Sequence, residues 1–291
     1  RMPIKTVASR FERIFSEIKK GGAVIHATAD SEGLAAIKKC LPSFIADAGI
    51  KPLKQKRRAS DAEFFALTAI PDSARVKQKN ATKVSAVSSR DEIAADETFI
   101  IPGTVGFAAS VVKSAPYDTP ECMEDAVFTR CMENTTLWEQ IRTVGGAYGV
   151  MFQPNSECAT STFSTYRDPK PLRSLAILNK CVDEASGTEF SPELVEKTVT
   201  GCYSAEIQPK TPSVKGGTGF LWELYCYTNS QQERRLKWLI SMSPKKLHFA
   251  ALRYAASSSH QTTVILCSKL LISGKLSEST GKIFNLPVYY K

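Results

Sequence analysis

The sequence predicts an α+β fold in which an antiparallel-rich sheet is flanked by helices. Strand-like runs at 98–115, 147–153 and 159–166 are joined by short links. Helical patterns fill 119–143 and then 170–257 as a block, and a final strand-like run follows at 262–268. Strands grouped apart from helices are typical of antiparallel pairing, whereas a parallel sheet built from βαβ units would alternate the two.

Composition divides the chain into four segments. Residues 1–49 read as helix, strand and helix, which is too little to close a core, so we expect the end of a preceding α+β domain. Residues 50–96 are polar and basic, as in a linker or a surface excursion. Residues 97–275 form the expected C-terminal domain, and 276–291 a tail. A length of 291 residues accommodates one or two domains.

The first segment predicts two helices on either side of a short strand. Apolar residues recur at helical spacing within 3–20 and stop at Gly21 and Gly22, and "AVIHATA" (23–29) alternates in part, as a strand does. A second helix follows Asp30 or Ser31 and ends near Gly49. His26 within this strand-like run is expected to be packed and hydrogen-bonded rather than a metal ligand. A chain that opens with part of a domain is expected to be a piece of a longer protein.

The elements expected within residues 97–275 follow from prolines and glycines between the apolar runs. Pro102 and Gly103 separate two strand-like runs, and a long helix is expected at 119–143. Three or four helices are predicted in 170–257, with "KGGTGF" (215–220) interpreted as a helix-breaking loop.

The net charge of +9 is concentrated in the first third of the chain. Residues 1–96 hold 18 basic and 11 acidic residues, with the densest run at "KPLKQKRR" (51–58). Such a run can bind nucleic acid or an anionic membrane, but it is also the composition of a solvated linker. It lacks the interleaved aromatic residues that stack single-stranded bases, so we expect neither a specific nucleic acid nor a membrane as partner.

Cysteine usage and the N-terminus indicate a reducing compartment. The eight cysteines contain no C-x-x-C pair, which favours free thiols over a zinc ribbon or a disulfide framework. The first residues lack the apolar core of a secretory signal, and no apolar run approaches the roughly 18 residues of a membrane span. The expected location is therefore cytoplasmic or an organellar matrix, and the protein is not expected to be secreted.

Common catalytic motifs are missing from the sequence. The three histidines form neither H-E-x-x-H nor its inverted form, so no metal site is expected in this chain. There is no G-x-S-x-G elbow and no phosphate-binding loop, and Gly145, Gly146 and Gly149 do not match the dinucleotide fingerprint. Taken alone, the chain does not have the residues of a complete catalyst.

The stretch "EQIRTVGGAYGVMF" (139–152) is the main candidate for a site. Arg142 lies in the last turn of the expected helix, four residues after Trp138, and Gly145 or Gly146 can end the helix with positive φ. Tyr148 then lies at the second position of the strand. A guanidinium and a phenol suit a peptide carbonyl or a developing oxyanion. Judged from the residues alone, an Arg that caps the helix and a Tyr in the core is the favoured interpretation.

Two motifs give the chain a family resemblance. "LWEQIRTVGGAYG" (137–149), followed by "TFSTYRDPKPLRSL" (162–175), resembles the C-terminal half of pitrilysin-type (inverzincin) metallopeptidases, and most closely their presequence-protease branch, which includes falcilysin-like enzymes. "IPGTVGFAASVVKSAPY" (101–117) resembles the first strands of the last pitrilysin-like domain, and "ATADSEGLAAIKKCLPSF" (27–44) resembles the end of the domain before it. Thr165 lies between Ser164 and Tyr166, where the usual pattern has no residue.

The resemblance implies a zinc enzyme of four similar domains, arranged as two halves that close around an unfolded peptide. Its zinc ligands belong to the first domain, so zinc is expected in the missing N-terminal half, and that half and the peptide substrate are the expected partners. Arg142 and Tyr148 are implied to contact the substrate across the chamber, and Gly145 and Gly146 set their positions. Arg167 is implied as a further substrate contact, although the Tyr-Arg-Asp-Pro segment is expected to be mainly structural. The alternative is a non-catalytic relative that binds peptides or holds a partner subunit.

Overall fold

The computed structural model describes residues 3–51, 97–258, 261–272 and 282–285. The chain divides into two compact units, one made of residues 1–69 and 208–229 and the other of residues 70–207 and 230–291. Residues 52–96, which include most of the basic run at 51–58 and most of the expected linker at 50–96, lie outside the described residues. The role of both therefore stays a prediction.

The first unit contains the two predicted N-terminal helices, α1 (Ile4–Gly21) and α2 (Ser31–Ala48). The side chain of Asp30 caps α2 by accepting from the N–H of Gly33 at 2.8 Å, and Gly49 ends the helix with a φ of 62°. The strand predicted at 23–29 is wrong, because these residues have no regular structure. A strand needs a neighbour to pair with, and the described residues of this unit form none.

The glycine cluster at 215–220 lies inside a helix, so the predicted loop is also wrong. Helix α7 (Pro212–Tyr225) contains the whole cluster, and the Thr211 side chain caps its start. A Cβ on Gly216 would collide with the side chain of Thr28, so the glycine permits a close approach of the chain. In the same unit, His26 stacks on Phe220 at 5.1 Å and shares a 3.0 Å hydrogen bond with the Thr28 hydroxyl. His26 is thus hydrogen-bonded and stacked, as predicted.

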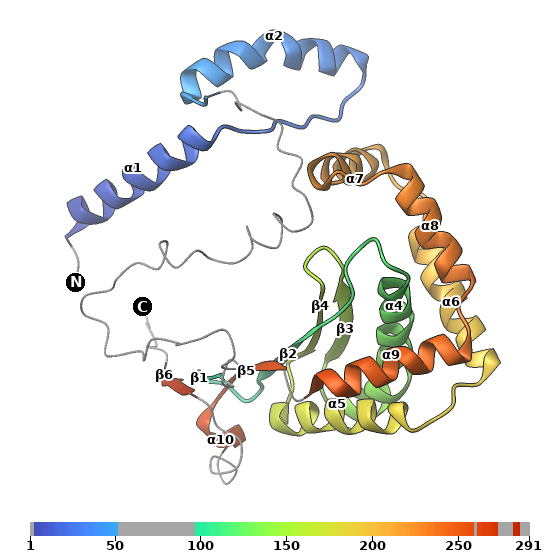
Figure 1. Cartoon of the computed structure of the whole chain (residues 1–291). Helices are drawn as coiled ribbons and strands as arrows, with labels where there is room; N and C mark the ends of the chain where they lie inside the picture. Colours follow the sequence, from blue (N-terminus) through green and yellow to red (C-terminus); the bar gives the residue numbers. More distant parts are fainter. Residues whose placement is uncertain (1–2, 52–96, 259–260, 273–281, 286–291) are drawn as a thin grey trace. The chain divides into compact units, whose positions relative to one another are not determined.

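The second unit is built on a sheet of six strands among the described residues. Its order is β3 (Gly149–Asn155), β4 (Thr160–Tyr166), β2 (Phe107–Lys113), β5 (Thr262–Cys267), β1 (Glu97–Ile100) and β6 (Lys282–Asn285). The pairings from β3 through β5 are antiparallel, and β1 pairs in parallel with both β5 and β6 (Figure 1). The predicted antiparallel-rich α+β fold is confirmed.

The side chains of the sheet alternate between a covered and an open face. In β2, Ala108, Ser110 and Val112 are buried, whereas Val111 is exposed. Strand β4 repeats this alternation from Ser161 to Thr165 and ends at the exposed Tyr166. Because successive side chains point to opposite faces, one face of the sheet receives the helices.

Helices α4 (Pro120–Met132), η2 (Glu133–Thr143), α5 (Pro171–Ser186) and α9 (Pro244–Ser257) pack against the strands (Figure 1). Helix α6 (Pro192–Glu206) packs on α4 and α9, and α8 (Asn229–Ile240) and the short α10 (Lys269–Ile272) are the other described helices of this unit. Between 170 and 257 the structure describes five helices, α7 included, rather than three or four. The missed boundaries carry Ser or Thr caps directly before a proline, at Ser191, Thr211 and Ser243.

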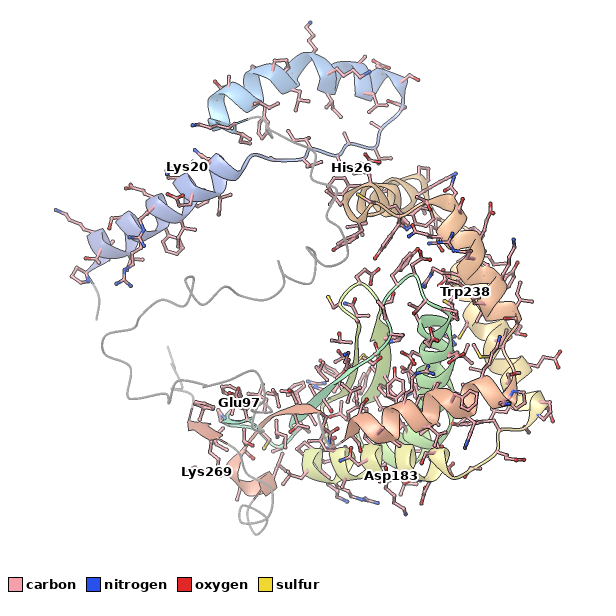
Figure 2. The ribbon with its side chains drawn as sticks, in the orientation of Figure 1. Lys20, His26, Glu97, Asp183, Trp238 and Lys269 are labelled. Carbon is pink, nitrogen blue, oxygen red and sulfur yellow. The ribbon has the colours of Figure 1, made fainter. Side chains whose placement is uncertain are left out.

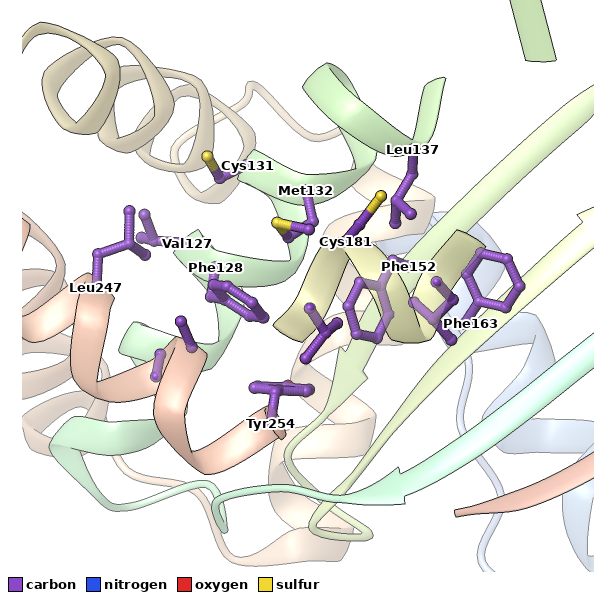
Figure 3. Packing of buried hydrophobic residues seen from close by; sticks show 14 of the residues in the cluster. Val127, Phe128, Cys131, Met132, Leu137, Phe152, Phe163, Cys181, Leu247 and Tyr254 are labelled. Carbon is purple, nitrogen blue, oxygen red and sulfur yellow. The ribbon is translucent and has the colours of Figure 1, made fainter. Parts of the chain in front are cut away.

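The hydrophobic core lies between α4, α5, α9 and the sheet (Figure 3). Phe128, Phe163 and Leu247 are fully buried in it, and Leu137 extends it to η2. The Tyr254 hydroxyl reaches Ser161 Oγ at 2.5 Å, and burial raises the pKa of this tyrosine. Charged side chains such as Asp183 on α5 lie on the outside (Figure 2).

The eight cysteines are free, as predicted from their spacing. Cys122, Cys131, Cys181, Cys202 and Cys267 are buried, whereas Cys40 and Cys158 are exposed. Most of the thiols therefore serve as small apolar side chains in the core.

Candidate functional site

Arg142 lies near the end of a π-helix, η2, which continues directly from helix α4. Helix α4 runs directly into η2, whose last bond joins the N–H of Val144 to the carbonyl of Glu139 at 2.9 Å. Leu137 and Ile141 are fully buried on one side of η2. Their sequence neighbours Trp138 and Arg142 lie on the accessible side, as the spacing predicts. The π-helix itself was not predicted, and such helices are frequent at functional sites.

The turn after η2 needs both glycines, for different reasons. Gly146 has a φ of 83°, and its N–H donates to the carbonyl of Arg142 at 3.0 Å. A Cβ on Gly145 would collide with the carbonyl oxygen of Ile141 and would lie 2.9 Å from that of Gln140. The N–H of Ala147 donates to the carbonyl of Ile141 at 3.1 Å and completes the turn. The turn predicted from the glycine pair is confirmed, with Gly146 as the left-handed residue.

Tyr148 lies immediately before β3 and points into solvent. Its side chain is 67% exposed, so it is not a core tyrosine. Its N–H donates to the carbonyl of Tyr166 at 3.1 Å and approaches that of Arg167 at 3.4 Å. The Tyr148 and Tyr166 rings meet edge to face at 5.8 Å, and among the described residues no hydrogen bond involves the Tyr148 hydroxyl.

The guanidinium of Arg142 is held by an aromatic ring instead of a carboxylate. Its Cζ lies 4.0 Å from the centroid of the Trp138 ring. Within the described part of the chain, no ion pair or hydrogen bond reaches the Arg142 side chain, so it does not cap its own helix. Its N–H donors are therefore available to an acceptor from outside.

The Tyr-Arg-Asp-Pro segment forms the opposite side of the turn. Arg167 has a φ of 50°. The N–H of Tyr148 approaches the carbonyls of both Tyr166 and Arg167, so these two residues lie opposite the single residue Tyr148, as in a β-bulge. Asp168 is 1% exposed, and its Oδ1 accepts from the N–H of Lys170 at 2.7 Å. Arg167 and Asp168 do not form an ion pair with each other, and α5 begins at Pro171. The carboxylate is instead used to order the backbone before the helix.

Backbone bonds bring the predicted residues to one place. Arg142 is tied to Gly146, and Tyr148 to Tyr166 and Arg167, by the bonds given above. A Cβ on Gly146 would touch Pro169 at 3.6 Å, so the turn lies against the segment that follows β4. Arg142, Tyr148 and Arg167 are thus linked through the backbone and are at least partly accessible, and their side chains can donate hydrogen bonds to carbonyl or oxyanion oxygens.

Trp138, Tyr166 and Glu133 were not predicted to support this site. Glu133 Oε2 accepts from the N–H of Phe152 at 2.8 Å, which satisfies an outward-facing donor on the edge strand β3. The spacing of Trp138 and Arg142 was visible in the sequence, but the stacking contact was not. No local pattern indicates the pairing of Glu133 with Phe152, because it depends on how η2 packs on the sheet.

The described residues do not fit a zinc site. They contain no group of three or more His, Cys, Asp or Glu side chains that could hold a metal ion. The side chain of His248 lies 3.2 Å from the carbonyl of Thr188, and His260 falls outside the described residues.

A cavity of about 460 Å³ lies elsewhere in the second unit. It is lined by Lys113, Ser114, Asp125, Arg253 and their neighbours, and Arg142, Tyr148 and Arg167 do not line it. Its polar groups are already paired in part, since Arg253 bonds both Glu124 and Asp125 at 2.8 Å.

Comparison with solved structures shows a similar fold in a known protein. The crystal structure of a protease from Helicobacter pylori superposes with a TM-score of 0.51 at 12% identity, over 67% of this chain and 49% of that one. At this identity the similarity concerns the fold alone. None of the described helices is both long and apolar enough to cross a bilayer.

The sequence comparison is more specific. The family model described as PreP C-terminal domain matches residues 96–269, so the chain belongs to this family. The mitochondrial presequence protease of Schizosaccharomyces pombe is 27% identical over 195 residues, which are 67% of this chain and 19% of that protein. Presequence protease 1 of Arabidopsis thaliana, described as chloroplastic/mitochondrial, is 26% identical over 152 residues, 52% of this chain and 14% of that protein. The chain thus spans less than a fifth of these relatives, and the resemblance to the presequence-protease branch of pitrilysin-type metallopeptidases is confirmed.

Proposed function

We propose that this chain is the C-terminal part of a zinc metalloendopeptidase that degrades unfolded peptides in a closed chamber. In this proposal Arg142 and Tyr148 donate hydrogen bonds to carbonyl oxygens of the substrate, and Tyr148 stabilises the developing oxyanion. The observation that supports it is the pair of accessible donors on either side of the Gly145–Gly146 turn, neither of which is used within the described structure.

Partners and location follow from the same proposal. The N-terminal half of the same enzyme supplies the zinc site, to which the described residues contribute no cluster of ligands. Peptides are the substrates, and Arg167 is a secondary contact. The names of the relatives support an organellar matrix as the location. No role is assigned to nucleic acid or to a membrane surface.

The test uses the full-length enzyme and a quenched-fluorescent, unstructured peptide. Tyr148→Phe removes only the phenolic hydroxyl and should lower kcat about 10²–10³-fold, the usual cost of one oxyanion donor. Tyr166→Phe is the matched control, because Tyr166 makes the facing ring contact and its hydroxyl has no role in the proposal. Arg142→Gln should likewise lower kcat/KM, whereas Arg173→Gln, at an exposed position of α5, should not.

Unchanged turnover in both Tyr148→Phe and Arg142→Gln would contradict the proposal. A second arm uses the chain alone. It should neither bind zinc with high affinity nor cut the peptide, and zinc-dependent cleavage by the isolated chain would also contradict the assignment of the zinc site to the other half.

A further inference from the structure

The contact between Trp138 and Arg142 has a consequence for how the guanidinium is presented. The five N–H donors of a guanidinium radiate in its plane. A contact through the flat face of the group therefore holds it without using the donors. The Arg142 Cζ lies over the Trp138 ring, 4.0 Å from its centroid, and this cation–π contact uses no hydrogen-bond donor of the guanidinium.

Other arginines of the second unit are held differently. Arg253 donates to Glu124 and Asp125, both at 2.8 Å. Arg235 donates to the carbonyl of Tyr117 at 3.1 Å and to Cys122 Sγ at 2.8 Å. Their donors are occupied by the fold, as in structural arginines. Arg235 also lies over an aromatic ring, that of Tyr117 at 4.2 Å, but its donors are bonded as well. Arg142 differs because, among the described residues, the Trp138 ring is the partner of its guanidinium and no acceptor uses its donors.

The ring itself is fixed by the core. Trp138 follows Leu137, and Arg142 follows Ile141, and these two preceding residues are fully buried. The buried pair anchors the backbone of η2 at both positions, whereas Trp138 stays 40% exposed. Because Trp138 is partly exposed, its ring is not needed to fill the core. The contact with the Arg142 guanidinium is the role that this large side chain has in the structure.

We propose that Trp138 is a positioning residue that holds the Arg142 guanidinium with its donors directed at the substrate. This inference rests on the proposed function of Arg142. Trp138 acts through Arg142 and does not itself need to touch the reacting atoms. Without the ring, the long Arg142 side chain samples several rotamers and spends less time in the productive one.

The experiment is a double-mutant cycle in the full-length enzyme, with Trp138→Leu, Arg142→Gln and the two combined. Trp138→Leu should lower kcat/KM about five- to tenfold, mainly through kcat, since a cation–π contact and correct placement of a donor are both lost. Trp138→Phe keeps an aromatic face and should retain most of the activity. In the Arg142→Gln background, Trp138→Leu should have no further effect, because the group that it positions is absent.

Each outcome decides between the explanations. If Trp138→Leu lowers the rate by the same factor with and without Arg142, its effect is structural and the inference is overturned. If Trp138→Leu leaves the rate unchanged while Arg142→Gln lowers it, Trp138 is not a positioning residue, and the proposed function of Arg142 stands. If Arg142→Gln and Tyr148→Phe both leave the rate unchanged, the proposed function fails together with this inference. Thermal melting of each variant shows whether the fold is retained, and Trp138→Phe provides the milder change if Trp138→Leu melts early.

Discussion

The backbone N–H of Tyr148 donates to the carbonyl of Tyr166 at 3.1 Å, and this bond joins the turn after η2 to the end of the neighbouring strand. A second bond, from the N–H of Gly146 to the carbonyl of Arg142, ties the turn to the helix. The positions of the two proposed donors are therefore set by backbone geometry. Changes to the turn should move Arg142 and Tyr148 relative to each other even when both side chains are intact.

The first prediction concerns the two glycines of this turn. Gly146→Ala places a Cβ at a φ of 83° and should destabilise the second unit by about 1–2 kcal/mol. Gly145→Ala should cost more, about 2–3 kcal/mol, because its Cβ meets the rigid carbonyl oxygens of Ile141 and Gln140. Both should also lower peptidase activity at least about tenfold, since misplaced donors lose transition-state contacts.

Urea unfolding and turnover of the same variants check this prediction. Gly187→Ala is the matched control, because Gly187 ends α5 with a φ of −98° and a Cβ there first meets an atom at 3.7 Å. The control should stay within about 0.5 kcal/mol of the parent. A Gly145→Ala variant as stable as the control would show that the turn is not as tight as described here.

The second prediction concerns the edge of the sheet. Glu133 Oε2 satisfies the N–H of Phe152, a residue that is 3% exposed, and Pro154 further along β3 has no N–H to present. Glu133→Ala should destabilise the unit by about 1–3 kcal/mol, because it leaves a buried donor unpaired. It should also promote association through the exposed edge.

Equilibrium unfolding and light scattering would measure both effects. Glu139→Ala is the control, since Glu139 lies on the same π-helix, is exposed and has no resolved partner for its side chain. Equal stability of the two variants would argue that the bond to Phe152 adds nothing.

The candidate site was predicted where its signals are local, and missed where they are not. Gly145, Gly146 and the buried pair Leu137 and Ile141 lie close in sequence, so their spacing was enough to predict a helix and a turn. The roles of Arg142 and Tyr148 came from the family resemblance, because the residues alone favoured a capping Arg and a core Tyr. The π-helix was invisible, because apolar residues four apart fit both an α-helix and a π-helix over so few turns.

The other misses share one physical cause. Residues 23–29 alternate like a strand, but a strand exists only if another strand pairs with it. The glycines at 216–219 resemble a loop, but contact with the segment around Thr28 makes small residues useful within a helix. In the first case a tertiary partner is missing and in the second a tertiary contact is present, and in both the tertiary environment overrides the local preference.

The third prediction tests that helix. Gly216 and Gly217 are adjacent in α7, and a Cβ on Gly217 meets nothing within 4 Å, whereas one on Gly216 collides with Thr28. Gly217→Ala should stabilise α7 by up to about 1 kcal/mol and slow its amide exchange. Gly216→Ala has the same helix propensity but should speed exchange in 23–30. Peptide-resolved hydrogen exchange of the two variants distinguishes the cases, and a loop at 215–220 would show fast exchange in both.

The fourth prediction concerns the buried thiols at alkaline pH. Burial raises the pKa of Cys122, Cys181 and Cys202 to about 11, whereas an unfolded thiol titrates near 8.5. Between roughly pH 9 and 11 the folded chain retains protons that the unfolded chain has lost, so stability falls as pH rises through this window. Each such thiol should cost the folded state up to about 3 kcal/mol at pH 11. The urea midpoint of unfolding should decline steadily when it is measured at about pH 7.5, 9 and 10.5, values that span this window. The midpoint of Cys181→Ala should decline less steeply than that of the parent. Cys158→Ala, which removes an exposed thiol, should follow the parent curve. Parallel curves for Cys181→Ala and the parent would mean that this thiol titrates in the folded chain as it does in the unfolded one.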